Sequence, residues 1–138
     1  MPAAARRVLF VESDESLRFL VHRVLSRTGI EADVVGEAAE AISRLAAQKY
    51  QVVAVDLVAG RGEGYPVVRA LSLIPAASRP IVIATGDPEG DPHLDAEVIS
   101  LVVRKPYDVQ ALSELIASSM SPEAAGAPDA REEGLPLC

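Results

Sequence analysis

Residues 52–56 read Val-Val-Ala-Val-Asp, a continuous apolar run that ends on an acid. Four apolar residues in succession suit a strand that is covered on both faces, as in a parallel sheet. Similar runs occur at residues 8–11, 81–84 and 101–103, and residues 32–35 form a weaker candidate with a more polar edge. The sequence therefore predicts five short strands.

Amphipathic segments separate these strands. Apolar residues within 17–25 and 38–46 follow the i, i+3, i+4 spacing of one helix face. Pro66 suits the first turn of a third helix running to about residue 73, and Asp108 suits the N-cap of a last helix. Two prolines and two glycines within residues 86–95 predict that a helix before the fifth strand is short, frayed or absent.

The alternation of strands and helices predicts one α/β domain at residues 6–120. Such alternation gives a parallel sheet with helices on both faces and right-handed crossovers. We expect residues 1–5 and 121–138 to be flexible ends. The second of these segments is rich in Pro and Gly and carries four acids against one Arg, which makes it an acidic tail.

The composition excludes several classes of protein. The 138 residues hold 13 basic and 20 acidic side chains, a net charge of −7, which disfavours binding to nucleic acid or to an anionic membrane surface. No apolar run approaches the roughly 20 residues that span a bilayer. The first residues lack the apolar core of a signal peptide, and the single cysteine, Cys138, allows no disulfide within one chain. A cytoplasmic location is therefore the default expectation.

Polar residues follow the expected strands, and in an open parallel sheet the ligand crevice lies beyond the carboxyl ends of the strands. Carboxylates from neighbouring strands can hold Mg²⁺, and an Asp beside it can act as a nucleophile toward phosphorus. A lysine and a hydroxyl would bind the phosphoryl oxygens. The candidates, in chain order, are Glu12, Ser13, Asp14, Asp56, Thr85 and Lys105.

Three short motifs stand in order on this pattern of strands. They are Asp56-Leu57 with Gly64 eight residues on, Ala84-Thr85, and Lys105-Pro106-Tyr107. With them, residues 7–119 resemble a CheY-like response-regulator receiver domain of two-component signalling. The resemblance implies a flavodoxin-like, doubly wound sheet of five parallel strands in the order 2-1-3-4-5, with a short or disordered fourth helix.

The resemblance also implies roles for particular residues. Asp56 would accept a phosphoryl group from a sensor histidine kinase, a phosphotransfer protein or a small phosphodonor. Thr85 would hydrogen-bond that group, and Lys105 would pair first with Asp56 and then with the phosphoryl oxygens. Glu12, Asp56 and the backbone carbonyl of Val58 would bind Mg²⁺.

Two positions depart from the family pattern. The family usually has two adjacent acids after the first strand, whereas this chain has Glu12 followed by Ser13. Ser13 is neutral and a poorer Mg²⁺ ligand, which leaves Ser13 or Asp14 as the additional candidate and weakens the expected metal affinity. Val102 stands where the family often has a Tyr or Phe that moves with the Thr. The Lys105–Pro106 bond is expected to be cis, as in the family.

Residues 83–86, Ile-Ala-Thr-Gly, are similar to the Phe-Ala-Thr-Gly motif of a subgroup of single-domain receivers in alphaproteobacteria. We therefore expect a stand-alone receiver, a monomer or weak dimer, that signals by phosphorylation-dependent binding to a protein partner. Neither nucleic acid nor a membrane is an expected partner. The protein would not be an enzyme beyond its own phosphorylation and dephosphorylation.

Other interpretations of the same residues stay open. Ser13 motivates a pseudo-receiver, a metal-independent interaction module with the same fold. A small phosphatase with Asp56 as nucleophile is disfavoured because Val58 stands where such enzymes usually have a second Asp. Residues 60–64 are glycine-rich but lack the spacing of a nucleotide-binding loop. Asp14 and Glu15 could simply be first-turn acids that the helix dipole favours.

Overall fold

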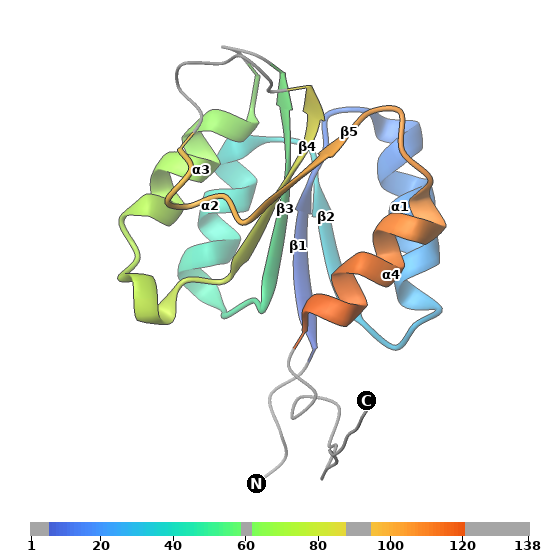
Figure 1. The fold of residues 1–138 in the computed structure, drawn as a ribbon, viewed down its shortest axis with the longest axis horizontal. Helices are drawn as coiled ribbons and strands as arrows, with labels where there is room; N and C mark the ends of the chain where they lie inside the picture. Colours follow the sequence, from blue (N-terminus) through green and yellow to red (C-terminus); the bar gives the residue numbers. More distant parts are fainter. Residues whose placement is uncertain (1–5, 59–61, 88–94, 121–138) are drawn as a thin grey trace, which may run out of the picture.

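The computed structural model describes residues 6–58, 62–87 and 95–120 (Figure 1). The expectations of flexible ends at residues 1–5 and 121–138 lie outside the described residues. The strands are β1 (Arg7–Val11), β2 (Glu31–Val35), β3 (Val52–Val58), β4 (Ile81–Asp87) and β5 (Leu101–Arg104). The helices are α1 (Glu15–Ser26), α2 (Ala38–Ala47), α3 (Gly64–Ser72), a 3-10 turn (Ala76–Ser78) and α4 (Val109–Ser119).

The five strands form one parallel sheet in the order β2-β1-β3-β4-β5, which confirms the expected fold class and strand order. Helices α2 and α3 cover one face of the sheet, and α1 and α4 cover the other (Figure 1). This arrangement places the carboxyl ends of β1, β3, β4 and β5 along the same edge.

The core has two layers, one on each face of the sheet. Alternate residues of a strand point to opposite faces: Leu9 packs in the layer under α2 and α3, whereas Val8 and Phe10 pack in the layer under α1 and α4. All three side chains are fully buried. Complete burial of such a side chain stabilises the fold by about 1.5–3 kcal/mol, so the two aliphatic layers hold the sheet edge in place.

The helix ends follow the local sequence. The Asp14 carboxylate caps α1 by accepting the Leu17 N–H, and the Asp108 carboxylate caps α4. Helix α3 begins at Gly64, so Pro66 lies in its first turn, where a missing N–H costs nothing. No helix in the described parts of the chain is long and apolar enough to cross a membrane.

One feature differs from the pattern read in the sequence, and a second agrees, within the described residues, with the expectation of a short, frayed or absent helix before the fifth strand. Strands β3 and β4 run on past the apolar residues, because their pairing continues from Asp56 opposite Thr85 to Val58 opposite Asp87. Between β4 and β5, residues 95–100 form a turn and no helix, while residues 88–94 lie outside the described residues. In this segment a buried valine, Val98, packs against the core layer under α2 and α3.

Candidate functional site

Four of the six candidate residues meet at the carboxyl edge of the sheet. Glu12 follows β1, Asp56 and Thr85 lie opposite each other on β3 and β4, and Lys105 follows β5. Glu12 and Thr85 are fully buried, and Asp56 is 8% exposed. Buried polar side chains cost free energy unless they are paired, so this cluster needs a specific arrangement of partners.

Lys105 is the cation of this cluster. Its Nζ lies 2.9 Å from Glu12 Oε2 and 3.4 Å from Asp56 Oδ1. The backbone N–H of Asp14 also donates to Glu12 Oε2, at 3.1 Å. The peptide bond between Lys105 and Pro106 is cis, as the resemblance implied.

The environment shifts the proton affinities of this pair. Burial raises the pKa of Glu12, against the hydrogen bond from Lys105, which lowers it. For Lys105, burial lowers the pKa, but the hydrogen bond and charge of Glu12 and the charge of Asp56 outweigh it, so the pKa is raised overall. The lysine therefore stays charged at neutral pH, which is the state that can bind an anionic group.

Ser13 and Asp14 take different places beside this cluster. The Ser13 Oγ–H donates to Asp56 Oδ2 across a long 3.5 Å contact. The Asp14 carboxylate is used as the cap of α1 and accepts the Leu17 N–H at 3.1 Å. The Ser13 side chain thus contacts the Asp56 carboxylate, whereas the Asp14 side chain caps α1.

Three buried oxygens in the cluster have no hydrogen-bond partner among the described residues. They are Glu12 Oε1, Asp56 Oδ1 and Thr85 Oγ1, although Asp56 Oδ1 keeps its 3.4 Å contact with the ammonium. Buried polar atoms are nearly always satisfied. These three oxygens at the carboxyl edge of the sheet therefore leave hydrogen-bonding or metal-binding capacity for another group.

The donor set fits a divalent cation with few protein ligands. Glu12 and Asp56 each offer one buried carboxylate oxygen without a hydrogen bond, and the described residues hold no group of three or more His, Cys, Asp or Glu side chains that could bind a metal ion. Mg²⁺ commonly binds one or two carboxylates and keeps several waters. Two carboxylates without a third acid at Ser13 are therefore compatible with Mg²⁺ at reduced affinity.

Two glycines allow the backbone to pack tightly around Asp56. A Cβ on Gly64 would lie 2.3 Å from the carbonyl oxygen of Asp56. A Cβ on Gly86 would lie 2.3 Å from the carbonyl oxygen of Leu57 and 2.7 Å from Asp56 Oδ1, and Gly86 also has a positive φ of 102°. The spacing from Asp56 marks Gly64 in the sequence, whereas no local signal there indicates the packing role of Gly86.

Glu63 has a structural role that sequence reasoning missed. Its Oε1 accepts the N–H of Ala38 at 2.7 Å, at the start of α2, where the preceding Glu37 offers no side-chain cap. The contact ties the start of α3 to a helix 25 residues earlier, and no local sequence signal reports such a pairing.

Arg18 was also missed. Its Nη1 donates to the carbonyl oxygens of Glu12 and Ser13, at 2.9 Å each, and so holds the β1–α1 turn. Gly36 leaves room for this side chain, because a Cβ there would lie 2.5 Å from the same nitrogen. The arginine therefore orders the turn that carries Glu12 into the site.

Three expected residues lie at the margin of the cluster. Val58 ends β3, two residues after Asp56. Val102 lies on β5 beside Ala84 and is 45% exposed. The Tyr107 hydroxyl is buried without a hydrogen-bond partner among the described residues, and burial together with the nearby carboxylates raises its pKa.

Comparison with known proteins supports the fold. No family model and no curated protein sequence matches this chain. Solved structures do: the CheY-like receiver domain from Methylobacillus flagellatus has a TM-score of 0.67 at 22% identity, and it covers 84% of this chain and 99% of that one. The CheY-like receiver domain protein from Methanospirillum hungatei JF-1 has a TM-score of 0.71 at 18% identity, with coverage of 89% and 98%. Chemotaxis response regulator CheY4 of Vibrio cholerae has a TM-score of 0.71 at 18% identity, with coverage of 85% and 100%.

These likenesses extend over almost the full length of each solved chain, and they agree with the fold and strand order described above. They are to receiver domains in general and do not distinguish the Phe-Ala-Thr-Gly subgroup. The chain therefore has the fold of the CheY-like response-regulator receiver domains.

Proposed function

We propose that this chain is a phosphoacceptor in two-component signalling and that Asp56 is the residue that accepts the phosphoryl group. The observation that carries the proposal is the position of Asp56: it is 8% exposed, with Lys105 Nζ at 3.4 Å and Ser13 Oγ at 3.5 Å. The fully buried Thr85 lies opposite it on β4 with an unpartnered hydroxyl. An anionic group bonded to Asp56 would find a cation and two hydroxyls around it.

The chemistry is a transfer from a phosphohistidine of a sensor kinase or phosphotransfer protein. A carboxylate oxygen of Asp56 attacks phosphorus, the phosphorus–nitrogen bond breaks, and the imidazole nitrogen takes up a proton. Lys105 moves from Glu12 toward the new phosphoryl oxygens, and Thr85 donates its hydroxyl to one of them. Bound Mg²⁺, held by Glu12, Asp56 and the Val58 carbonyl, would neutralise phosphoryl charge. In this role the chain is not an enzyme toward external substrates.

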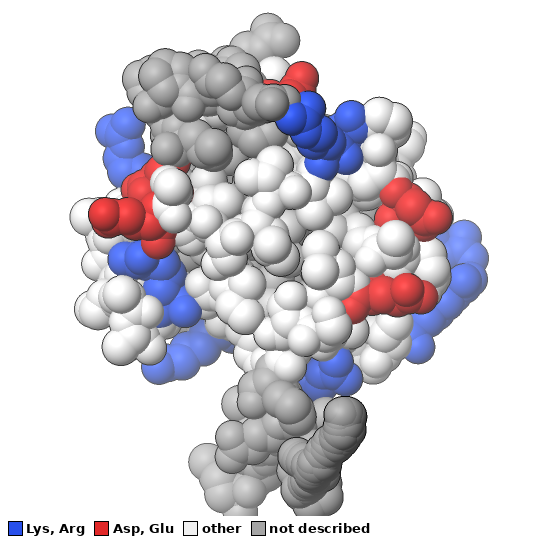
Figure 2. Space-filling view, viewed as in Figure 1, with Lys and Arg blue, Asp and Glu red and all other residues white. Residues whose placement is uncertain are grey.

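A protein partner suits the surface next to this site. Figure 2 looks onto β5 and shows few charged side chains in the middle of that face. Leu101 and Val102 on this strand are 42% and 45% exposed. An area with few charges that exposes two aliphatic side chains favours a protein over a nucleic acid as the partner. Signalling of this kind would take place in the cytoplasm, with the chain as a monomer or weak dimer.

Direct phosphorylation tests the proposal. The full chain is incubated with acetyl phosphate or phosphoramidate, with Mg²⁺ or with a chelator, and its mass is measured. We expect one phosphoryl adduct that is stable in acid and labile in base, absent from Asp56→Asn and retained by the control Asp87→Asn. Asp87 is exposed at the end of β4. An adduct that persists in Asp56→Asn would refute the assignment.

A second candidate is the metal-independent interaction module, which Ser13 favours because the second acid is missing. It predicts no adduct with small phosphodonors or with histidine kinases. The variant Ser13→Asp separates the cases, because a third carboxylate at this position should tighten Mg²⁺ binding. Unchanged Mg²⁺ affinity in Ser13→Asp would show that residue 13 lies away from the ligand position.

A further inference from the structure

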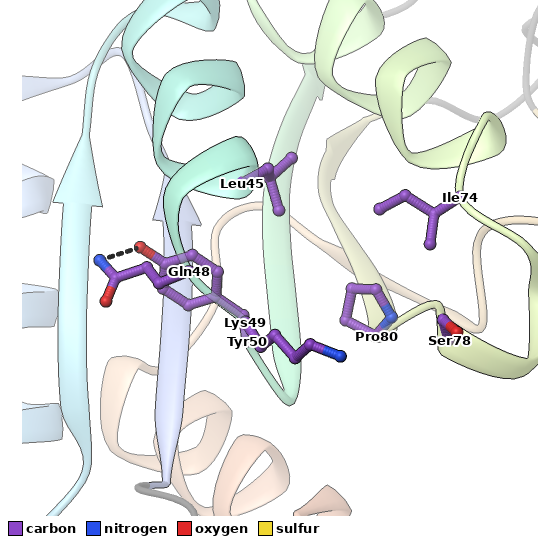
Figure 3. A pocket seen from close by; sticks show the side chains of 7 residues that line it. All are labelled: Leu45, Gln48, Lys49, Tyr50, Ile74, Ser78 and Pro80. Carbon is purple, nitrogen blue, oxygen red and sulfur yellow. Dashed lines mark hydrogen bonds between the residues drawn. The ribbon is translucent and has the colours of Figure 1, made fainter.

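A pocket lies at the opposite end of the sheet from Asp56. It opens at the amino ends of β3 and β4, next to the end of α2, and has a volume of about 230 Å³. Figure 3 shows the side chains that border it. They are Leu45, Gln48, Lys49, Tyr50, Ile74, Ser78 and Pro80.

Hydrogen bonds to and between its own lining residues hold one wall of the pocket rigid. Tyr50 is 7% exposed, and its hydroxyl donates to Asp33 Oδ2 at 2.5 Å. The Gln48 amide donates to the Tyr50 hydroxyl at 3.1 Å, drawn as a dashed line in Figure 3, and to Asp33 at 3.2 Å. Arg44 forms an ion pair with the same aspartate at 3.4 Å. The tyrosine ring is therefore fixed before any ligand arrives, which lowers the entropic cost of binding.

Two exposed polar side chains that border the pocket, Lys49 and Ser78, have no partner among the described residues. In Figure 3 the Lys49 side chain extends toward Pro80, and Ser78 lies beside it. Neither the Lys49 ammonium nor the Ser78 hydroxyl has a hydrogen bond or ion pair with any described residue. No acid lines the pocket, so the one charge at its mouth is positive.

The interior between these groups is apolar. Leu45, Ile74 and Pro80 present aliphatic surface, and all three are partly buried. An apolar protein cavity of about 150 Å³ can hold benzene, so a pocket of 230 Å³ can take a slightly larger molecule. A ligand that satisfies both regions needs a small apolar body and one negative charge.

We propose that this pocket binds a small monocarboxylate whose apolar body is about the size of a benzene ring. The body fills the space between Leu45, Ile74 and Pro80. The carboxylate lies at the mouth, where the Lys49 ammonium and the Ser78 hydroxyl donate to it. The site does not depend on phosphorylation of Asp56, because it lies at the other end of the sheet.

The lysine content of the chain allows a sharp test. Lys49 and Lys105 are its two lysines, so full-length protein with ¹³C-labelled lysine Cε gives one signal from each site. Titration with benzoate should shift the Lys49 signal saturably and leave the Lys105 signal in place. Benzylamine, which has the same ring but a positive charge, should leave the Lys49 signal unshifted.

Variants identify the contacts. Lys49→Met, read through the methyl signals of Leu45 and Ile74, should weaken benzoate binding by about fivefold or more, because a charge-assisted hydrogen bond is lost. Ser78→Ala should weaken it less. Arg27→Met is the matched control, because it removes an exposed cation at the C-terminal end of α1, on the other face of the sheet from α2. This variant should bind benzoate as the wild type does.

Four results would overturn the proposal. The first is the absence of a saturable shift with benzoate, and the second is an equal response to benzylamine. The third is unchanged benzoate affinity in Lys49→Met. A benzoate-dependent shift of the Lys105 signal alone would place the anion at the acidic cluster and equally contradict the pocket.

Discussion

Replacement of Lys105 by methionine removes the cation of the acidic cluster and keeps the length of the side chain. Glu12, which is fully buried, then loses its 2.9 Å partner and keeps only the Asp14 N–H. Removing one member of a buried ion pair typically costs 3–5 kcal/mol. The cost here is smaller, because the lysine side chain is 31% exposed and part of its charge is already screened. We therefore expect the free energy of unfolding to fall by about 2 kcal/mol at pH 7.

A double-mutant cycle separates the ion pair from lost packing. Glu12→Gln removes the buried charge, so the double variant with Lys105→Met should recover about 1–2 kcal/mol relative to simple additivity. The penalty of Lys105→Met alone should shrink as the pH is lowered toward 5, because a protonated Glu12 needs no cation. The chain has no Trp, so urea unfolding is followed by far-UV circular dichroism, in the presence of a chelator. A loss below about 0.5 kcal/mol, with no coupling between the two positions, would refute the reasoning.

Three further predictions concern stability, each measured by urea unfolding. Gly86→Ala should lower the free energy of unfolding by about 3 kcal/mol, because the new Cβ would lie 2.3 Å from a carbonyl oxygen. Gly29 also has a positive φ, of 79°, but has open space around it, so Gly29→Ala should lower this free energy by only about 1–2 kcal/mol. Equal losses in the two variants would exclude the steric contact at Gly86. Glu63→Ala should cost about 1 kcal/mol through the uncapped N–H of Ala38, and no loss would mean that the cap is unimportant. Burial and the hydrogen bond to Asp33 raise the pKa of Tyr50 from 10.0 to about 12. The stability advantage of the wild type over Tyr50→Phe should therefore be complete below pH 10 and disappear as the pH rises to 12. If the stability difference between the wild type and Tyr50→Phe did not change with pH, the Tyr50 hydroxyl would have the same pKa in the folded and unfolded states.

The side chains that gather at the carboxyl edge of the sheet were predictable, because a parallel sheet allows few positions for the ends of its strands. Once the apolar runs are assigned to parallel strands, their carboxyl ends share one edge, and Glu12, Asp56, Thr85 and Lys105 follow from position alone. The N-cap of α4 was predictable for the same kind of local reason, since the carboxylate of Asp108 reaches N–H groups two and three residues on.

The long-range contacts of single side chains were not predictable. Glu63 caps a helix that begins 25 residues earlier, and Arg18 binds carbonyls that any residue would offer. No periodicity or residue spacing in the sequence signals either contact, because each depends on how segments of the chain approach each other in space. The extension of β3 and β4 was missed because Gly86 and Asp87 are poor strand formers, and only the pairing with Leu57 and Val58 holds them there.

Ser13 changes the electrostatics of the site more than its geometry. Glu12, Asp56 and Lys105 together carry one net negative charge, and an acid at position 13 would make this two. Charges a few ångströms apart interact by several kcal/mol at the dielectric of a partly buried site. A site with one net negative charge repels an incoming phosphoryl group less, and it gains less from a divalent cation. In the proposed function, Ser13 would therefore separate two properties that a third acid would link: Mg²⁺ affinity would decrease, while the approach of an anion to Asp56 would become easier.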